Sequence, residues 1–427
     1  GGRKGAACER GGVQWAAMGA YLSQPVTAKD SHDGVGADFV FGGSCMQGWR
    51  KSMEDAEILL PELSPEHQDT AMFAVFDGHG GTEVSKFCQK YMPGELAKIE
   101  QFKNGELGAG LANAFHRMDE MIDDEKFDHE LNVMRMGEDE RDMSISGLPG
   151  GVAGKEDGEE VSSSPGAGGS GGGAGGAARG KSDAVRMQEM QDPMSMLKEF
   201  LASRKQQGAD MRQQAGQPPV ASRDGVCMLP DHRIAAGCTA VVCLKRGSQV
   251  VVANAGDSRA VLCRGGEAVA LSYDHKPNQE REHNRIRKAG GFVRDANGHH
   301  RVNGNLNLSR AIGDLKYKAD KRIPREEQII TAEPDIIEET LTAADEFIVL
   351  CCDGVWDVMS NQEVCDFVSA RLTEYGGKDG ARSKEEKASI CKKICEDLVD
   401  NCIADDPRQT QGIGGDNMSA VVVLLQQ

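Results

Sequence analysis

Two apolar stretches that each end in Asp-Gly decide the fold of this chain: Met72-Phe73-Ala74-Val75-Phe76-Asp77-Gly78-His79-Gly80-Gly81 and Phe347-Ile348-Val349-Leu350-Cys351-Cys352-Asp353-Gly354. Short runs of β-branched and aromatic residues that stop at glycine are typical of buried strands. A third aspartate, Asp416, precedes the apolar run 420–425, and the acidic pair Glu54-Asp55 lies in a polar segment. We therefore predict that four acidic clusters at strand ends form one metal site.

The composition of these clusters indicates which metal they bind. Carboxylates that lie close together raise each other's pKa, and a divalent cation relieves the repulsion. Hard oxygen ligands without neighbouring His or Cys favour Mg²⁺ or Mn²⁺ over Zn²⁺. The glycine after Asp77 and after Asp353 has no Cβ, so it permits a turn and a close backbone approach. The carbonyl of Gly78 is therefore a further candidate ligand.

Two side chains near the acidic clusters suit phosphate chemistry. His79 lies two residues after Asp77, where an imidazole is able to protonate a leaving alkoxide; taken alone, it equally fits a structural histidine in a tight turn. Arg50 lies four residues before Glu54, a spacing that places both side chains on one side of an extended strand. Beside bound metals a guanidinium grips phosphate bidentately, and the alternative is a weak surface ion pair with Glu54.

The whole-chain composition limits the class of protein. The 427 residues carry a net charge of −18, which argues against nucleic acid as a partner. The 13 cysteines include no C-x-x-C pair, so they indicate free thiols in a reducing compartment. No apolar run reaches the roughly 18 to 20 residues of a transmembrane segment, and no cleavable signal is visible. We expect an intracellular protein of the cytoplasm or nucleus.

The first residues need a separate interpretation. Residues 1–17 show no clear periodicity, and we predict a disordered N-terminal extension. Met18-Gly19-Ala20-Tyr21-Leu22-Ser23 matches the Met-Gly-x-x-x-Ser/Thr pattern of N-terminal acylation. Gly19 is internal as the chain stands, so lipidation and membrane association require that translation starts at Met18. Even then, a single myristoyl chain gives only marginal membrane binding.

A change in composition predicts a long insertion. Residues 123–160 hold 13 acidic and 4 basic residues, and the Gly/Ala/Ser-rich tract 147–180 overlaps and follows them. The backbone entropy of such a tract is not offset by apolar burial. Helical spacing returns at 187–201, where Asp192-Pro193 fits a helix start; this is either a transient helix or one that docks a partner. We predict one domain over 18–427, interrupted by a low-complexity insertion at about 123–230.

Outside the insertion, strand and helix signals follow one another. Strand signals cover 39–76, 239–244, 250–254 and 260–263, and Asn297-Gly298 marks the tip of a hairpin. Helix signals cover 82–91, 111–122, 279–288 and 390–402, and Ser360 with Glu363 forms a capping box for a further helix. This order predicts an α+β fold in which antiparallel sheets form a sandwich flanked by helices.

Seven motifs, in this order along the chain, resemble those of the metal-dependent protein serine/threonine phosphatases of type 2C. The motifs are Arg50-Lys51-Ser52-Met53-Glu54-Asp55, Asp77-Gly78-His79-Gly80-Gly81, Gly237-Cys238-Thr239-Ala240, Ala253-Asn254-Ala255-Gly256-Asp257-Ser258-Arg259-Ala260, Leu308-Ser309-Arg310-Ala311-Ile312-Gly313-Asp314, Asp353-Gly354-Val355-Trp356-Asp357 and Asp416-Asn417-Met418-Ser419. The ordered set is specific, whereas each motif alone is weak. The segment 18–25 and the insertion most resemble the gamma isoform, although its acidic tract is longer.

The resemblance implies a central antiparallel β-sandwich flanked by α-helices, with a binuclear Mg²⁺ or Mn²⁺ centre at one end. By matched motif positions, Asp77 bridges the two ions and Gly78 ligates through its carbonyl. Asp353 and Asp416 complete the shell of one ion.

Other matched positions have less direct roles in the implied site. Glu54 and Asp55 act mostly through metal-bound water, and Asp257 and Asp357 correspond to a weaker third metal position. The resemblance also implies that Arg50 holds the substrate phosphate and that His79 is the general acid.

The activity implied is hydrolysis of phosphoserine and phosphothreonine in proteins, by direct attack of a metal-activated water on phosphorus. We expect phosphorylated proteins as substrates and a monomeric enzyme, with the insertion as a candidate docking segment for a partner. Two alternatives are a catalytically weak scaffold with the same fold and a hydrolase of small phosphoesters. The scaffold is disfavoured because Asp77, Asp353 and Asp416 are all present, whereas the second alternative uses the same chemistry.

A rival phosphatase chemistry is suggested by Cys402 and Arg408, which have the Cys-x5-Arg spacing of cysteine-dependent phosphatases. The intervening segment lacks the glycine-rich loop that offers backbone N–H groups to phosphate. Asp405 and Asp406 would repel the anion and raise the pKa of the thiol. We interpret this match as a coincidence of spacing.

Overall fold

The computed structural model describes residues 21–136, 229–296, 298–378 and 380–426. The N-terminal extension 1–17, Gly19, and the candidate helix at 187–201 lie outside the described residues. Most of the predicted insertion lies outside them as well.

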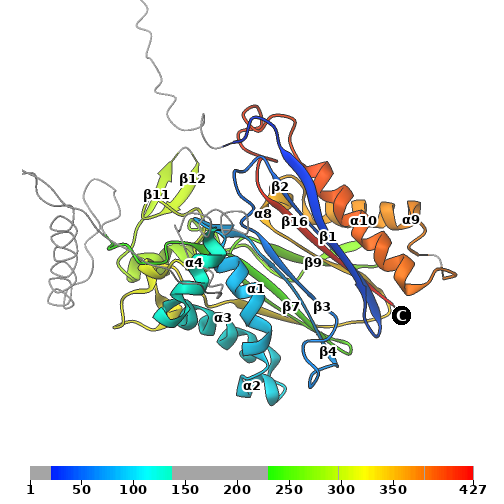
Figure 1. Cartoon of the computed structure of the whole chain (residues 1–427), viewed down its shortest axis with the longest axis horizontal. Helices are drawn as coiled ribbons and strands as arrows, with labels where there is room; N and C mark the ends of the chain where they lie inside the picture. Colours follow the sequence, from blue (N-terminus) through cyan, green and yellow to red (C-terminus); the bar gives the residue numbers. More distant parts are fainter. Residues whose placement is uncertain (1–20, 137–228, 297, 379, 427) are drawn as a thin grey trace, which may run out of the picture. The chain divides into compact units, whose positions relative to one another are not determined.

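Two antiparallel sheets face each other in the centre of the fold (Figure 1). The six-stranded sheet consists of β1 (Val26–Val35), β2 (Phe39–Gly48), β16 (Met418–Leu425), β15 (Asp345–Cys351), β9 (Arg259–Arg264) and β10 (Glu267–Ala270), in that spatial order. The five-stranded sheet consists of β14 (Asp335–Thr340), β8 (Gln249–Ala255), β7 (Ala240–Arg246), β4 (Thr70–Phe76) and β3 (Ala56–Leu60).

Strand β4 is apolar from residue 71 to residue 76 because both of its faces are buried. Phe73 and Val75 face the six-stranded sheet, whereas Met72, Ala74 and Phe76 face the helices on the other side. The ring of Phe73 packs edge-on against Phe41 of β2, with 5.2 Å between ring centroids. A strand buried on both faces reads as a continuous apolar run, which is the pattern seen before Asp77.

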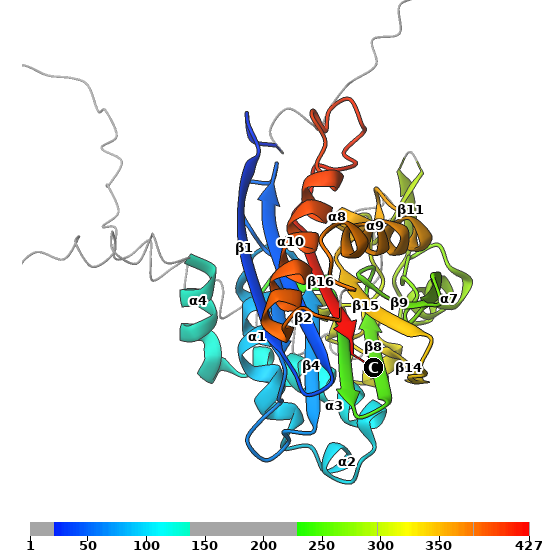
Figure 2. The same cartoon turned by 90° about the vertical axis from the view of Figure 1, so that its right-hand side faces the viewer.

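Helices cover the outer face of each sheet (Figure 2). The five-stranded sheet is covered by α1 (Glu83–Leu96) and α3 (Leu107–Asp123), accompanied by α2 (Glu100–Lys103) and α4 (Asp128–Met136). The six-stranded sheet is covered by α9 (Asn361–Glu374) and α10 (Lys384–Cys402). This arrangement confirms the predicted α+β sandwich.

Smaller elements surround the ends of the strands. They are a three-stranded sheet of β13 (Ile312–Gly313), β6 (Gly237–Cys238) and β5 (Gly78–His79), the hairpin of β11 (Val293–Ala296) and β12 (His299–Val302), α7 (Glu280–Lys288), α8 (Asp353–Trp356), and the 3₁₀ turns Glu125–Phe127, Leu315–Lys318 and Arg325–Glu327. The predicted hairpin and the Ser360–Glu363 capping box are confirmed. Within the described residues, no helix has the length and apolar character needed to cross a membrane.

Two features of the fold differ from the prediction: where the insertion begins, and the presence of strand β1. The described fold continues to Met136, past residue 123, because Leu131 of α4 is buried and Glu130 accepts hydrogen bonds from Lys90 and Tyr91 of α1. The acidic composition of this segment obscured its packing. Strand β1 was not predicted either, because most of its side chains are polar and it lies at the edge of its sheet.

Candidate active site

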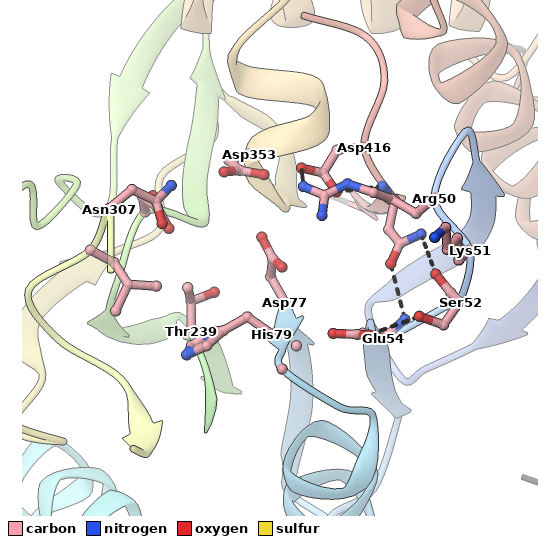
Figure 3. Close-up of a pocket in the computed structure, with 15 residues that line it drawn as sticks. Arg50, Lys51, Ser52, Glu54, Asp77, His79, Thr239, Asn307, Asp353 and Asp416 are labelled. Carbon is pink, nitrogen blue, oxygen red and sulfur yellow. Dashed lines mark hydrogen bonds and ion pairs between the residues drawn. The ribbon is translucent and has the colours of Figure 1, made fainter. Parts of the chain in front are cut away.

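A pocket of ≈ 390 Å³ opens where strands of both sheets end, and it brings together most of the predicted site residues (Figure 3). Its wall includes the side chains of Arg50, Glu54, Asp77, His79, Asp257, Asp353 and Asp416, together with Gly78. These residues come from segments that are far apart in the sequence. The predicted convergence of acidic strand ends is therefore observed.

Three carboxylates lie closest together in this pocket. Asp77 follows β4, Asp257 follows β8, and Asp353 begins α8 directly after β15. One carboxylate oxygen of each lies within 4.8 Å of the other two. Asp77 and Asp353 point toward each other in Figure 3. The family resemblance implied only a third metal position for Asp257, but the structure places it beside the two central aspartates.

The glycines of the two Asp-Gly motifs allow close backbone approach. A Cβ on Gly78 would lie 2.1 Å from the carbonyl oxygen of Glu54, and a Cβ on Gly354 would lie 2.2 Å from that of Asn417. Neither glycine has a positive φ. Close packing, and not an unusual turn, therefore requires glycine here, and it brings the other acidic segments against Asp77 and Asp353.

The carboxylates in the pocket repel one another. Burial and the charges of Asp353, Asp55 and Asp416 raise the pKa of Asp77 well above its ordinary value. Burial followed by the charge of Asp257 does the same to the pKa of Asp353. A set of crowded, hard oxygen donors of this kind fits Mg²⁺ or Mn²⁺, whose charge would relieve the repulsion.

Two cations lie at the edge of the carboxylate group. The Lys276 Nζ is 2.5 Å from Asp257 Oδ2, a contact that the sequence did not suggest. The Arg50 Nη2 is 2.5 Å from Asp416 Oδ2, and the Arg50 side chain is 50% exposed. The alternative role for Arg50 was an ion pair with Glu54. The structure instead pairs Arg50 with Asp416 and leaves the guanidinium at the mouth of the pocket.

Glu54 is held by hydrogen bonds. Its Oε1 accepts from the Ser52 hydroxyl at 2.8 Å, and its Oε2 accepts from the Gly81 N–H at 3.2 Å. The side chain of Asn417 accepts from the backbone N–H of Glu54 at 3.0 Å and donates to the carbonyls of Gln47 and Ser52. Asn417 thus positions the loop that carries Arg50 and Glu54, a role for which its place beside Asp416 was the sequence signal.

His79 is paired with a residue that sequence reasoning missed. Its Nε2 lies 2.7 Å from Asp314 Oδ2, and the Asp314 side chain is only 3% exposed. Burial lowers the pKa of His79, but the charge and hydrogen bond of Asp314 outweigh this effect and raise it above the ordinary value. Asp314 adopts a left-handed backbone with φ of 50°. The sequence signal that could have identified Asp314 was its position at the end of the motif 308–314.

Two predicted site residues do not line the pocket. Asp55 is 6% exposed, and its Oδ2 accepts from the Ser419 hydroxyl at 2.7 Å. Burial raises the pKa of Asp55 to about 7. Asp357 follows α8 and is exposed, away from the pocket wall. Direct contact with an ion in the pocket is therefore not indicated for either side chain.

The structure argues against Cys402 as the nucleophile of a cysteine-dependent phosphatase. Cys402 is the last residue of α10, and it is 3% exposed. Burial raises the pKa of its thiol to about 12. Because the thiolate is the nucleophile in cysteine-dependent phosphatases, this residue is unsuited to that role.

Comparison with known proteins agrees with these features. The family described as Protein phosphatase 2C matches residues 39–139 and 179–410. Probable protein phosphatase 2C 11 of Oryza sativa subsp. japonica is 38% identical over 410 residues, which cover 96% of this chain and 91% of the rice protein. Protein phosphatase 1G of Bos taurus, a gamma-type relative, is 35% identical over an alignment of 526 residues, which covers 96% of this chain and 93% of the cattle protein.

A solved structure supports the fold independently. The serine-threonine phosphatase 2C from Toxoplasma gondii aligns with a TM-score of 0.54 and 16% sequence identity, covering 93% of this chain and 99% of that one. At this identity the likeness concerns the fold alone. The family match and the relatives above 30% identity decide the assignment: this chain belongs to the protein phosphatase 2C family.

Proposed function

We propose that this chain is a Mg²⁺- or Mn²⁺-dependent enzyme that hydrolyses phosphoserine and phosphothreonine in proteins by direct attack of water on phosphorus. Membership of the protein phosphatase 2C family supports the reaction class. The observation that carries the metal dependence is the group formed by Asp77, Asp257 and Asp353, whose carboxylate oxygens crowd within 4.8 Å. Such a group is costly unless a cation neutralises it.

The family resemblance supports the following assignment of metal-holding residues. Asp77 would contact two ions, with the carbonyl of Gly78 as a further donor, and Asp353 and Asp416 would contact one of them. When bound, such ions supply Lewis acidity and lower the pKa of water toward neutrality. Glu54, at the pocket wall, and the buried Asp55 would act through ordered water.

Two further aspartates are assigned to a third metal position. Asp257 and Asp357 would hold a weaker third ion. Because Asp257 lies against Asp77 and Asp353 while Asp357 lies off the pocket wall, Asp257 is the member of this pair with more influence on the first two ions.

Arg50 is placed to recognise the phosphate. Its guanidinium is half exposed and is held by Asp416 alone among the pocket carboxylates. If Asp416 binds a cation, Arg50 becomes free to pair with the substrate, and a guanidinium binds phosphate oxygens bidentately. Arg50 would thereby orient the phosphoryl group and stabilise its charge during transfer.

His79 is placed to deliver a proton to the leaving seryl or threonyl oxygen. It lies at the pocket wall, and Asp314 fixes the ring through Nε2. A positioned acid matters most when the leaving alkoxide is a strong base, as it is for serine and threonine. Aryl phosphates depend on this proton much less.

The experiment that tests this function measures phosphate release from a phosphothreonine peptide. We expect activity with Mn²⁺, none with excess EDTA, and recovery when Mn²⁺ is restored. Equal rates with Mn²⁺ and with EDTA would refute the metal-dependent mechanism. A parallel assay of small alkyl phosphates separates the proposed activity from that of a small-phosphoester hydrolase, because the peptide should have the higher kcat/KM.

A further inference from the structure

A second pocket, of ≈ 780 Å³, is lined by residues of β1, β2, β3 and α1. We call it the edge pocket. Its wall combines the apolar side chains of Phe41, Met53 and Leu59 with the carboxylates of Asp55 and Glu57. Its volume is within the range of small-molecule sites, about 300 to 1,000 Å³.

Glu57 occupies a position where an apolar residue would be expected. Strand β3 alternates, so that Ala56 and Ile58 face the helices while Glu57 and Leu59 face the space between the sheets. Glu57 is only 9% exposed, and its Oε2 has no hydrogen-bond partner. Burial of an unpaired carboxylate is unfavourable unless a partner compensates it.

Strand β2 is shaped to accommodate this carboxylate. A Cβ on Gly43 would lie 2.9 Å from Glu57 Oε2 and 3.0 Å from Oε1. Glycine at this position therefore leaves the space into which the acid extends. Cys45 lies on the same pocket wall, and its thiol is only a weak hydrogen-bond donor.

A second unsatisfied oxygen lies on the same wall. Asp55 Oδ1 is buried without a hydrogen-bond partner, while its Oδ2 is occupied by Ser419. Among the described residues, the metal-like spacing of three donor atoms occurs only at Asp77, Asp257 and Asp353. Asp55, Glu57 and Cys45 are therefore not arranged around a compact ion, and a larger cationic group suits them better.

The rim of the edge pocket also favours a cation. Asp30 and Asp33 line its mouth, where Asp30 lies 3.1 Å from His32 and Asp33 lies 2.8 Å from Lys392. Of the two lysines on the wall, Lys29 is already paired with Asp400, with 2.7 Å between Nζ and Oδ1. Lys86 is the remaining cation, and it projects from α1 at partial exposure. Carboxylates thus outnumber cations on the wall of this pocket.

We propose that the edge pocket binds an organic cation, an ammonium or guanidinium group carried on an apolar stem. The cationic group would lie between Glu57 and Asp55, and the stem would pack against Phe41, Met53 and Leu59. A free alkylamine and a lysine or arginine side chain of a peptide share this chemistry. The proposal goes beyond the catalytic function, because Glu57 does not line the active-site pocket; Asp55 is the one residue that both proposals use.

The test uses the full chain and isothermal titration calorimetry with hexylamine, hexylguanidine and the neutral 1-hexanol. The titrations are run at about pH 8.5, where the alkylamine and the alkylguanidine are both cationic. We expect both cations to bind at least tenfold more tightly than hexanol. Glu57→Gln should weaken the cations at least tenfold and leave hexanol unchanged, whereas Glu62→Gln, an exposed matched control, should change neither.

A second variant keeps the test decisive if Glu57→Gln folds poorly. Gly43→Ala fills the space beside the Glu57 carboxylate and should weaken cation binding while peptide hydrolysis is retained. A Leu-Lys-Leu peptide blocked at both ends by acetylation and amidation carries its only cation on the lysine side chain, so it distinguishes a side-chain source from a free amine. The source that binds more tightly is the assigned one. Absence of cation binding, or equal binding by the wild type and both pocket variants, would overturn the proposal.

Discussion

The active-site pocket and the cluster around Glu282 both concentrate carboxylates, but they differ in how the central carboxylates are paired. In the second cluster Glu282 is paired with two buried arginines, whereas the cations of the pocket pair with Asp257 and Asp416 at its edge. Glu282 is 1% exposed; its Oε1 accepts from Arg310 Nη2 at 2.7 Å, and its Oε2 accepts from Arg285 Nη1 at 2.5 Å. Arg310 is also buried, and it reaches Asp335 at 2.9 Å. In the active-site pocket, by contrast, Asp77, Asp257 and Asp353 face one another.

The direction of the pKa shifts expresses this difference. Burial alone would raise the pKa of Glu282, but the hydrogen bonds from Arg310 and the charge of Arg285 lower it to about 2. The pKa values of Asp77 and Asp353 are raised. In the Glu282 cluster, the arginines of the protein stabilise the ionised carboxylate. In the active-site pocket, the ionised carboxylates require a cation from solution to be stabilised. The first cluster supports the fold, and the second is suited to bind metal.

The largest expected effect is that of Asp77→Asn on activity. Loss of the central carboxylate should reduce kcat for a phosphothreonine peptide by on the order of 10³-fold or more, since charge stabilisation in the transition state is removed. The same change relieves repulsion, so the metal-free variant should melt no lower than the wild type. Thermal melts with and without Mn²⁺ check this, with Asp366→Asn on the exposed face of α9 as control. A variant that kept the full Mn²⁺-induced rise in Tm would contradict the assignment.

The next effect is that of Glu282→Gln on stability. It leaves Arg285 and Arg310 buried without their carboxylate, and breaking such a cluster typically costs about 3–5 kcal/mol. Urea unfolding should show this loss equally in Mn²⁺ and in EDTA. The matched control is Arg281→Met: Arg281 is 71% exposed and also pairs with Asp335, and it should cost no more than about 1 kcal/mol. Rescue of Glu282→Gln by Mn²⁺ would erase the distinction between the two clusters.

The free energy of unfolding should depend on pH in opposite directions for the two clusters, so one pH series distinguishes their contributions. The pKa of Glu282 is lowered, so its stabilisation is present above the ordinary value of 4.5 and is lost as the pH falls through about 2. The pKa of Asp55 beside the pocket is raised to about 7, so its contribution is present below its ordinary value of 3.8 and is lost as the pH rises through about 7. A tenfold difference in proton affinity between the folded and unfolded protein corresponds to about 1.4 kcal/mol of stability.

Together, the contributions of Glu282 and Asp55 to the stability of the metal-free protein should be greatest between pH 3.8 and 4.5. Mn²⁺ should remove the decline on the alkaline side, because it stabilises the ionised carboxylates. Thermal melts from pH 3 to 8, with and without Mn²⁺, measure both limbs. A metal-free Tm that rises steadily up to pH 8 would contradict the raised pKa values.

Much of this comparison was accessible from the sequence, because the relevant signals are local. The continuous apolar runs before Asp77 and Asp353 predicted strands buried on both faces, and the acidic residues at their ends predicted the convergence that the structure contains. The fold class followed from the order of strands and helices. These predictions rest on patterns within about ten residues.

The partners of those residues were not accessible in the same way. Asp314 is 235 positions from His79, and Lys276 meets Asp257 only because two connecting segments pack together. No periodicity encodes such contacts. Strand β1 was missed for a different reason: Lys29, Asp30 and Asp33 follow no apolar alternation, and charged residues of this kind protect an exposed sheet edge from pairing with other chains.

The smallest expected effect concerns one pair of opposite charges at the pocket wall, His79 and Asp314. Asparagine tolerates the left-handed backbone at position 314, so Asp314→Asn should preserve the fold while weakening the hold on His79. We expect kcat for the phosphothreonine peptide to fall about tenfold, with a smaller loss for an aryl phosphate, because only the alkoxide needs a strong proton donor.

The double variant makes this last prediction specific. If Asp314 acts only through His79, then Asp314→Asn added to His79→Gln should cause little further loss of kcat, whereas independent roles would give additive losses in activation free energy. The Mn²⁺-induced rise in Tm should stay unchanged in both single variants, since neither removes a carboxylate from the Asp77, Asp257 and Asp353 group. A reduced Mn²⁺ response in Asp314→Asn would instead place Asp314 among the residues that hold the ions. The pocket would then contain one more carboxylate that is stabilised by cations from solution, whereas Glu282 is stabilised by arginines of the protein.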